Sequence, residues 1–212
     1  MNAKASTFGV VVAGGRSVRF GGEKAAALLA GRPLLQWATA RLSACCALVA
    51  VNARPGTEAE ALARSAGFHV LHDEPGDATG PLAGVKVGLS WGQSQGATRI
   101  AVSSCDSPCL PDALFPALIA ASMAAESGAA FAVTSEGRQP LCAVWPVAAL
   151  PEVTAALRDG AHPPTWRLLE SIGAKAVEFS PPEAFANVNT REDLEVLARR
   201  FHQPRHQPRH QR

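Results

Sequence analysis

Short apolar runs alternate with longer segments of helical periodicity along the first half of the chain. The apolar runs, which we expect to be strands, are 8–13, 47–52, 68–71 and 99–104. The intervening segments, which we expect to be helices, are 33–42, 57–66, 81–91 and 111–125. The first run is apolar on both faces, as buried parallel strands are. The alternation predicts an α/β fold built on a doubly wound, mainly parallel sheet with right-handed crossovers.

The pattern changes after residue 128. Two apolar runs, 129–134 and 141–145, follow each other closely across a turn at Glu136-Gly137-Arg138. Consecutive strands with so short a connection must run antiparallel, which predicts an antiparallel addition to the sheet. Two short helices, one strand and a last helix are then expected at 147–157, 165–172, 176–179 and 191–200. Thr190 and Asp193 stand at the spacing of a capping box for the last helix.

The chain has 212 residues, which predicts a single domain over residues 1–200. Residues 201–212 contain a repeat of His-Gln-Pro-Arg, with a proline every fourth residue. Such a segment has little to pack against a core, so we expect a disordered tail. Its histidines could bind a divalent metal, but solvated side chains are the simpler interpretation.

Composition and charge exclude several classes of protein. With 47% hydrophobic and 18% charged residues the chain is not globally disordered, and no apolar run is long enough to cross a membrane. The start resembles no secretory signal, and five cysteines form no even disulfide framework, so we expect a cytoplasmic protein. The net charge of +2 comes from arginines 199, 200, 205, 209 and 212; the rest has 15 basic and 18 acidic residues. Nothing therefore indicates nucleic acid as a partner of the body.

A glycine-rich and basic loop follows the first strand. Residues 12–24 contain four glycines together with Arg16, Arg19 and Lys24. Glycines let backbone N–H groups approach an anion, and the carboxyl end of a parallel strand is where open α/β sheets bind ligands. The spacing matches neither the P-loop nor the dinucleotide pattern. We interpret the loop as a phosphate site; the alternative is a strand-to-helix turn with solvated charges.

Polar side chains also end the other expected strands. Asp106 follows the fourth strand, where its carboxylate could hold Mg²⁺ against triphosphate oxygens. It could instead cap the following helix, although Pro108 and Pro111 place that start later. Asn52 and Asp73 follow the second and third strands, where turn residues are also common.

The cysteines and tryptophans carry weaker signals. Cys105 and Cys109 are not followed by a second pair at zinc spacing, so all five cysteines are interpreted as small apolar residues. The four tryptophans are expected in the core, although Trp145 or Trp166 could stack on a ligand ring.

The loop and its companion motifs together resemble the molybdenum cofactor guanylyltransferase family of the nucleotidyltransferase superfamily. The resemblance rests on V-A-G-G-R-S-V-R-F-G-G-E-K, A-G-R-P-L-L, G-P-L-A-G, C-D-S-P and N-V-N-T, and covers nearly everything except the tail. Glu23, Phe20 and Ser103-Ser104 depart from the family pattern, where Asp, Met and a proline are common. None of these departures removes a phosphate ligand.

The resemblance implies roles for individual residues. Residues 1–110 would form the nucleotide-binding half and 111–200 the acceptor-binding half. Lys24, Arg19 and Asp106 would be catalytic, with Mg²⁺ on Asp106. The nucleotide would lie against Val12, Ala13, Gly14, Gly15, Lys24, Asn52, Asp73 and Asp106. Asn187 and Asn189 would contact the acceptor, unless they only shape the turn before Thr190.

The implied reaction transfers GMP from GTP to the terminal phosphate of molybdopterin and releases pyrophosphate. Other partners would be molybdoenzyme-assembly proteins. Three alternatives remain: a cytidylyltransferase for the same pterin, a sugar-phosphate enzyme, and a nucleotide-binding regulator without turnover. The presence of both Lys24 and Asp106 argues against the last.

Overall fold

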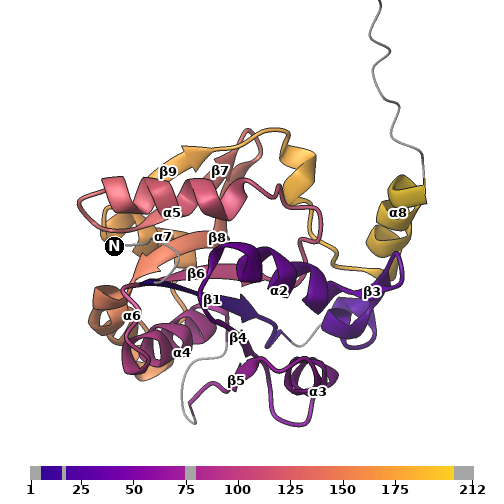
Figure 1. Cartoon of the computed structure of the whole chain (residues 1–212), viewed down its shortest axis with the longest axis horizontal. Helices are drawn as coiled ribbons and strands as arrows, with labels where there is room; N and C mark the ends of the chain where they lie inside the picture. The colour runs from indigo at the N-terminus through magenta and orange to yellow at the C-terminus, as the bar shows by residue number, and fades with distance from the viewer. Residues whose placement is uncertain (1–5, 16–17, 75–79, 203–212) are drawn as a thin grey trace, which may run out of the picture.

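The computed structural model describes residues 6–15, 18–74 and 80–202 of the chain. The strands of its main sheet are β1 (Thr7–Val12), β4 (Val49–Asn52), β5 (His69–Leu71), β6 (Arg99–Ser104), β7 (Ala130–Thr134), β8 (Gly137–Pro146) and β9 (Lys175–Glu178). The α-helices are α2 (Leu34–Cys45), α3 (Glu58–Ser65), α4 (Pro81–Ser94), α5 (Leu114–Ala124), α6 (Leu150–Ala156), α7 (Thr165–Ser171) and α8 (Arg191–His202). Figure 1 shows their arrangement.

The sheet has the order β5-β4-β1-β6-β8-β7-β9, with β1 between β4 and β6. β1, β4, β5 and β6 pair in parallel, as the alternating pattern predicts. The chain proceeds from β1 to β4 and β5 on one side, and then crosses to β6 on the other. This reversal leaves a crevice at the carboxyl ends of β1 and its neighbours, where α/β sheets bind ligands. Val12, Asn52 and Ser104 lie in register there.

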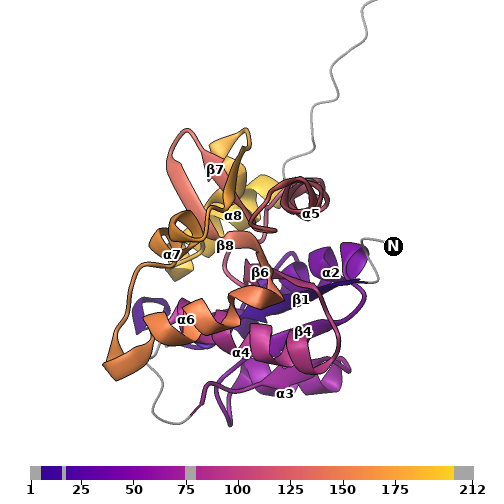
Figure 2. The same cartoon turned by 90° about the vertical axis from the view of Figure 1, so that its left-hand side faces the viewer.

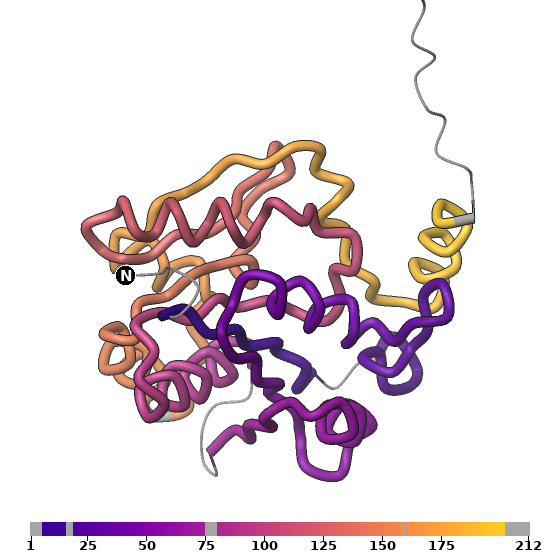
Figure 3. The backbone as a smooth tube through the Cα atoms, in the orientation of Figure 1, coloured from indigo at the N-terminus to yellow at the C-terminus, as the bar shows by residue number. Residues whose placement is uncertain are grey.

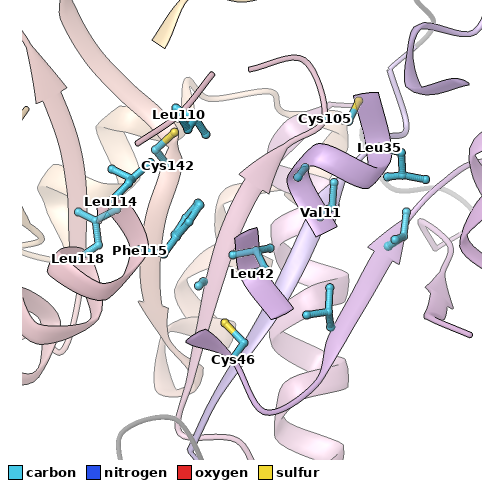
Figure 4. Close-up of a cluster of buried hydrophobic side chains, with 14 of the residues drawn as sticks. Val11, Leu35, Leu42, Cys46, Cys105, Leu110, Leu114, Phe115, Leu118 and Cys142 are labelled. Atoms are coloured by element: carbon cyan, nitrogen blue, oxygen red, sulfur yellow. The ribbon is translucent and has the colours of Figure 1, made fainter. Parts of the chain in front are cut away.

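Helices cover both faces of the sheet, so the fold has three layers (Figure 2). Alternate residues of β1 belong to opposite cores: Val11 packs among side chains from α2 and α5, and Val10 among side chains from α4 and the α6–α7 segment. Figure 4 shows the first core, where Val11, Leu42 and Phe115 lie between β1 and the helices. Burial on both faces explains why β1 carries no polar side chain after its first residue, Thr7.

The second half adds the expected antiparallel strand. β8 pairs antiparallel with both β6 and β7, and β9 then pairs parallel with β7. The turn is tighter than the sequence suggested: Gly137 and Arg138 already belong to β8, whose first residues pair with the end of β7. Because β8 is ten residues long, its amino-terminal part reaches the ligand-binding edge of the sheet.

Local end signals operate as expected. The Thr57 hydroxyl accepts a hydrogen bond from the Glu60 amide at the start of α3. Gly67, with a φ of 77°, follows the end of this helix, where a left-handed residue is needed and glycine adopts it without a Cβ penalty. No helix within the described part of the chain has the length and apolarity of a membrane span.

The last helix returns to the amino-terminal part of the molecule. In Figures 1 and 3, α8 lies beside the short hairpin of β2 (Leu28–Leu29) and β3 (Arg32–Pro33), which the sequence pattern did not predict. Val188 and Leu197 share a buried cluster with Phe20, Leu29 and Leu34. The segment that ends in α8 therefore packs against the residues that follow the glycine-rich loop.

The last helix runs two residues past residue 200, where the sequence analysis expected the domain to end. α8 continues to His202, and the Phe201 ring lies 5.4 Å from the Trp37 ring in an edge-on contact. This contact with an aromatic ring of α2 stabilises the end of α8. The proposed tail from residue 203 onward, together with Arg16, lies outside the described residues.

Candidate active site

A cavity of about 530 Å³ opens at the carboxyl edge of the sheet, above β1, β4 and β6. Its lining residues come from most of the polar segments that the sequence singled out: Val12, Ala13, Gly14, Gly15, Arg19, Lys24, Ala25, Asn52, Arg54, Asp73, Gly80, Pro81, Ser104, Cys105, Asp106, Leu141 and Asn189. Of the candidate site residues that the structure describes, Asn187 alone is not part of this lining. The topology thus gathers segments as far apart in the chain as Val12 and Asn189 around one space.

A lysine–aspartate pair lies at one end of the cavity. The Lys24 Nζ is 2.7 Å from the Asp106 Oδ2, and the two side chains are 13% and 21% exposed. Lys24 follows the loop after β1, and Asp106 follows β6, so the pair bridges the crevice between these strands. The Asn189 Oδ1 accepts from the same ammonium at 3.5 Å. The positive charge and the carboxylate therefore sit together where the phosphates were expected.

The segment before α8 is fastened to the end of β6. The Val188 amide donates to the Asp106 carbonyl at 2.8 Å, and the Ser107 hydroxyl donates to the Asn187 Oδ1 at 2.6 Å. Asn187 and Asn189, on either side of Val188, consequently point to different surroundings. Asn189 lines the cavity, whereas Asn187 is exposed outside the cavity lining and bound to Ser107.

Asn52 and Asp73 form a second polar pair at the other end of the cavity. The Asn52 Nδ2 donates to the Asp73 Oδ1 at 2.8 Å and to the Leu71 carbonyl at 3.4 Å. Asn52 is only 2% exposed, and its Oδ1 points at Gly84 of α4. A Cβ at Gly84 would lie 2.6 Å from that oxygen, which explains the last glycine of the G-P-L-A-G motif. The pair is thus held rigidly, with Asp73 facing the cavity.

The start of the glycine loop supplies backbone rather than side chains. The Ala13 amide donates to the Asn52 carbonyl at 2.8 Å, which continues the β1–β4 ladder into the loop. A Cβ at Gly14 would approach the Asn52 Oδ1 at 3.4 Å, while one at Gly15 would meet nothing within 4 Å. Gly14 therefore permits close packing against Asn52, and Gly15 leaves its backbone open to the cavity.

Arg54 and Leu141 are among the lining residues that escaped the sequence analysis. Arg54 lines the cavity two positions after Asn52, and its position just beyond a strand end was the signal that could have identified it. Leu141 lines the cavity from β8. Only the antiparallel direction of β8 brings it there, so no local pattern could have shown it.

Glu23, which replaces the usual aspartate of the family pattern, has a structural partner. Its Oε2 accepts from the Ala59 amide in the first turn of α3 at 3.1 Å. A carboxylate at a helix N-terminus satisfies an amide that has no intrahelical partner. This bond ties Glu23, which directly precedes Lys24, to the first turn of α3.

The thiol in the cavity lining is chemically inert. Burial, with the nearby Asp106 carboxylate, raises the pKa of Cys105 to about 12. Only the thiolate is a nucleophile or a metal ligand, so Cys105 stays a neutral apolar group at neutral pH.

Asp106 can hold a divalent metal only in partnership with a substrate. The described residues contain no cluster of three or more histidine, cysteine or carboxylate side chains. Mg²⁺ is commonly bound by one or two carboxylates plus substrate phosphates and water, so a lone carboxylate beside a lysine fits such a site.

The mainly parallel sheet, with its glycine-rich loop and with Asp106 at the point where the strand order reverses, has the fold of solved nucleotidyltransferase structures. The structure of molybdopterin-guanine dinucleotide biosynthesis protein A from Archaeoglobus fulgidus superposes with a TM-score of 0.73 at 20% identity, covering 92% of this chain and 98% of that one. A 4-diphosphocytidyl-2C-methyl-D-erythritol synthase from Anaerococcus prevotii superposes at 0.71 with 11% identity, covering 95% and 98%.

Sequence comparison narrows this class. Residues 9–177 match the model of the MobA-like NTP transferase domain, and the chain belongs to that family. It is 32% identical to a molybdenum cofactor guanylyltransferase of Serratia proteamaculans, over 87% of this chain and 90% of the relative. It is 35% identical to one of Cereibacter sphaeroides, over 88% and 93%. The resemblance inferred from the motifs is confirmed.

Proposed function

We propose that the protein transfers GMP from GTP to the terminal phosphate of molybdopterin, forming molybdopterin guanine dinucleotide and pyrophosphate. The observation that carries the proposal is the Lys24–Asp106 pair in one cavity with the Asn52–Asp73 pair. Two relatives named molybdenum cofactor guanylyltransferase, each matched over nearly nine-tenths of this chain, support the choice of nucleotide and acceptor.

The base would lie at the Asn52–Asp73 end. Guanine presents N–H donors at N1 and N2 and an acceptor at O6. Asp73 supplies a carboxylate as acceptor, and the backbone from Val12 to Gly15 supplies further polar groups. Adenine presents the opposite pattern at positions 1 and 6, and an unpaired buried polar group costs about 1–3 kcal/mol.

The triphosphate would extend toward Lys24. The ammonium of Lys24, the guanidinium of Arg19 and the open amides around Gly15 would bind its oxygens. Mg²⁺ held by Asp106 would neutralise charge on the transferred phosphoryl group and on the pyrophosphate. Positive charge at this end stabilises the leaving group more strongly in the transition state than in the ground state.

The reaction requires no general base from the protein. A phosphate monoester has its second pKa near 6, so the acceptor is largely a dianion at neutral pH. One of its oxygens attacks the α-phosphorus of GTP while the bond to the β-phosphate oxygen breaks. Asn189, which lines the cavity next to Lys24, would orient the incoming phosphate, and Asn187 would hold this segment in place through its bond to Ser107.

The test is a competition between GTP and CTP. Purified protein is incubated with both nucleotides at equal concentration, Mg²⁺ and molybdopterin, and the dinucleotide is identified by mass. We expect the guanine product in excess, together with pyrophosphate release that EDTA abolishes. A cytosine product in excess would overturn the choice of base, and binding of GTP without any transfer would indicate a regulator.

A further inference from the structure

The cap of α8 reaches beyond its own helix. As the sequence predicted, the Thr190 hydroxyl accepts from the Asp193 amide at 3.1 Å, and the Asp193 Oδ2 accepts from the Thr190 amide at 2.8 Å. The same carboxylate oxygen also accepts from the Asn189 amide at 2.8 Å. These bonds lower the pKa of Asp193, with the Asn189 amide the largest cause. A capping box satisfies the helix end alone, so the bond to Asn189 is additional.

Asn189 is the residue through which this segment reaches the site. Its Oδ1 accepts from the Lys24 ammonium at 3.5 Å, and that ammonium is 2.7 Å from Asp106. Its neighbour Val188 is 1% exposed and bonded to the Asp106 carbonyl. The Asp193 carboxylate therefore fixes the backbone of Asn189, which among the described residues is the one cavity-lining residue that follows β8 in the chain.

The helix that carries Asp193 is anchored to the loop that carries Lys24. Leu197 of α8 shares a buried cluster with Phe20 and Leu29, and the Arg191 guanidinium lies 5.6 Å from the centre of the Phe20 ring. Figure 3 shows α8 beside this early part of the chain. The packing of α8 on Phe20 and Leu29 thus holds its N-terminal cap in position relative to the loop that carries Lys24.

We propose that Asp193 is a positioning residue for the acceptor, acting through Asn189. The inference rests on the proposed function, in which Asn189 orients the acceptor phosphate. By accepting from the Asn189 amide, Asp193 holds the Asn189 side chain against Lys24 and beside Asp106. The base-binding groups Asn52 and Asp73 lie on β4 and just beyond β5, away from α8. Asp193 should therefore affect use of the acceptor much more than it affects GTP affinity.

A matched pair of variants separates positioning from helix capping. Thr190→Ala removes one bond of the capping box and keeps both bonds to the carboxylate, whereas Asp193→Ala removes both carboxylate bonds. Each loses a cap, so both should lower the melting temperature by about 2–4 °C. Only Asp193→Ala should reduce kcat/KM for molybdopterin, by about 10- to 100-fold, because misplacement of a substrate-orienting group by an ångström has such an effect. Asp193→Asn, which keeps an accepting oxygen, should recover most of the loss.

Two further measurements test the route through Asn189. In the full chain, hydrogen exchange at the Asn189 amide should accelerate in Asp193→Ala and stay slow in Thr190→Ala. In a double-mutant cycle on transfer, Asp193→Ala should have little further effect once Asn189→Ala is present. The dissociation constant of GTP with Mg²⁺ should change by less than about twofold in each Asp193 variant.

The two proposals fail differently. If the wild-type chain transfers no nucleotide to molybdopterin, the proposed function fails. If transfer is normal in the wild type but Thr190→Ala and Asp193→Ala lower it equally, Asp193 only caps α8. Additive effects of Asn189→Ala and Asp193→Ala, or an equal loss of GTP affinity, would also overturn the positioning role.

Discussion

At the scale of single residues, the charges at the phosphate end should control the rate. Asp106→Ala should lower Mg²⁺-dependent transfer by at least about 100-fold, the usual effect of removing one electrostatic stabiliser. The fold should survive, because Asp106 follows the end of β6 and contributes no apolar surface to either core. Asp112→Ala, which removes an exposed carboxylate from the loop before α5, is the control. Metal-dependent turnover near the wild-type rate would contradict the metal assignment.

Lys24→Ala should slow transfer more than it weakens GDP binding. The ammonium meets charge that grows on the leaving pyrophosphate, so its effect is larger in the transition state than in the ground state. We expect transfer to fall by about 100- to 1000-fold. Lys175→Ala removes the same charge from an exposed position on β9 and should leave both quantities unchanged. Unchanged turnover in Lys24→Ala would show that the lysine is only a solvated charge of the loop.

Gly84 tests the rigidity of the base end. Alanine is the better helix former by about 1 kcal/mol, so Gly84→Ala would stabilise α4 if space allowed. Its Cβ would instead lie 2.6 Å from the Asn52 Oδ1, and Asn52 cannot move without losing its bond to Asp73. We expect GTP affinity to fall by about 5- to 150-fold, corresponding to about 1–3 kcal/mol. Calorimetric titration measures this, and Gln93→Ala, at an exposed position of α4, should have no effect.

At the scale of elements, the end of α8 can be located by truncation. A chain that stops after His202 should melt at the wild-type temperature, because the removed residues, 203–212, include no aliphatic or aromatic side chain that could pack in a core. A chain that stops after Arg200 also loses the Phe201–Trp37 contact. An aromatic pair contributes about 0.5–1.5 kcal/mol, so the melting temperature should fall by about 2–4 °C. Equal melting temperatures for the two truncations would show that Phe201 does not stabilise the domain.

At the scale of the whole molecule, nucleotide binding should stabilise the fold in one transition. The cavity is lined by the loop after β1, the ends of β4 and β6, and the segment before α8, so a ligand links both halves of the chain. GTP with Mg²⁺ at 100 times its dissociation constant should add about 2.7 kcal/mol, or about 5–10 °C in melting temperature. CTP at the same concentration should add less, and EDTA should reduce the GTP effect. An equal shift with all nucleotides would indicate that the site does not select the base.

The sequence by itself determined most of the helices and strands and the positions of the polar residues at the strand ends. Local apolar periodicity predicts the alternation of strands and helices. The strand expected at residues 99–104, for example, is β6 with the same bounds, Arg99–Ser104. The ends of strands are also local signals, and they drew attention to Asn52, Asp73 and Asp106, all of which line the cavity. The roles predicted for Asn52 and Asp73 came from the resemblance to the family, because a polar residue at a strand end is also common in turns. The capping box at Thr190 and Asp193 is likewise a matter of spacing along one turn.

Tertiary structure decided what depends on distant pairings. Leu141 reaches the cavity because β8 runs antiparallel to β6, and Asn189 reaches Lys24 because α8 packs on Phe20. It also separated Asn189, which lines the cavity, from Asn187, which is bound to Ser107. A side chain's direction and partner depend on which elements pack together, and packing minimises exposed apolar surface over the whole chain. No pattern within a single segment records that result.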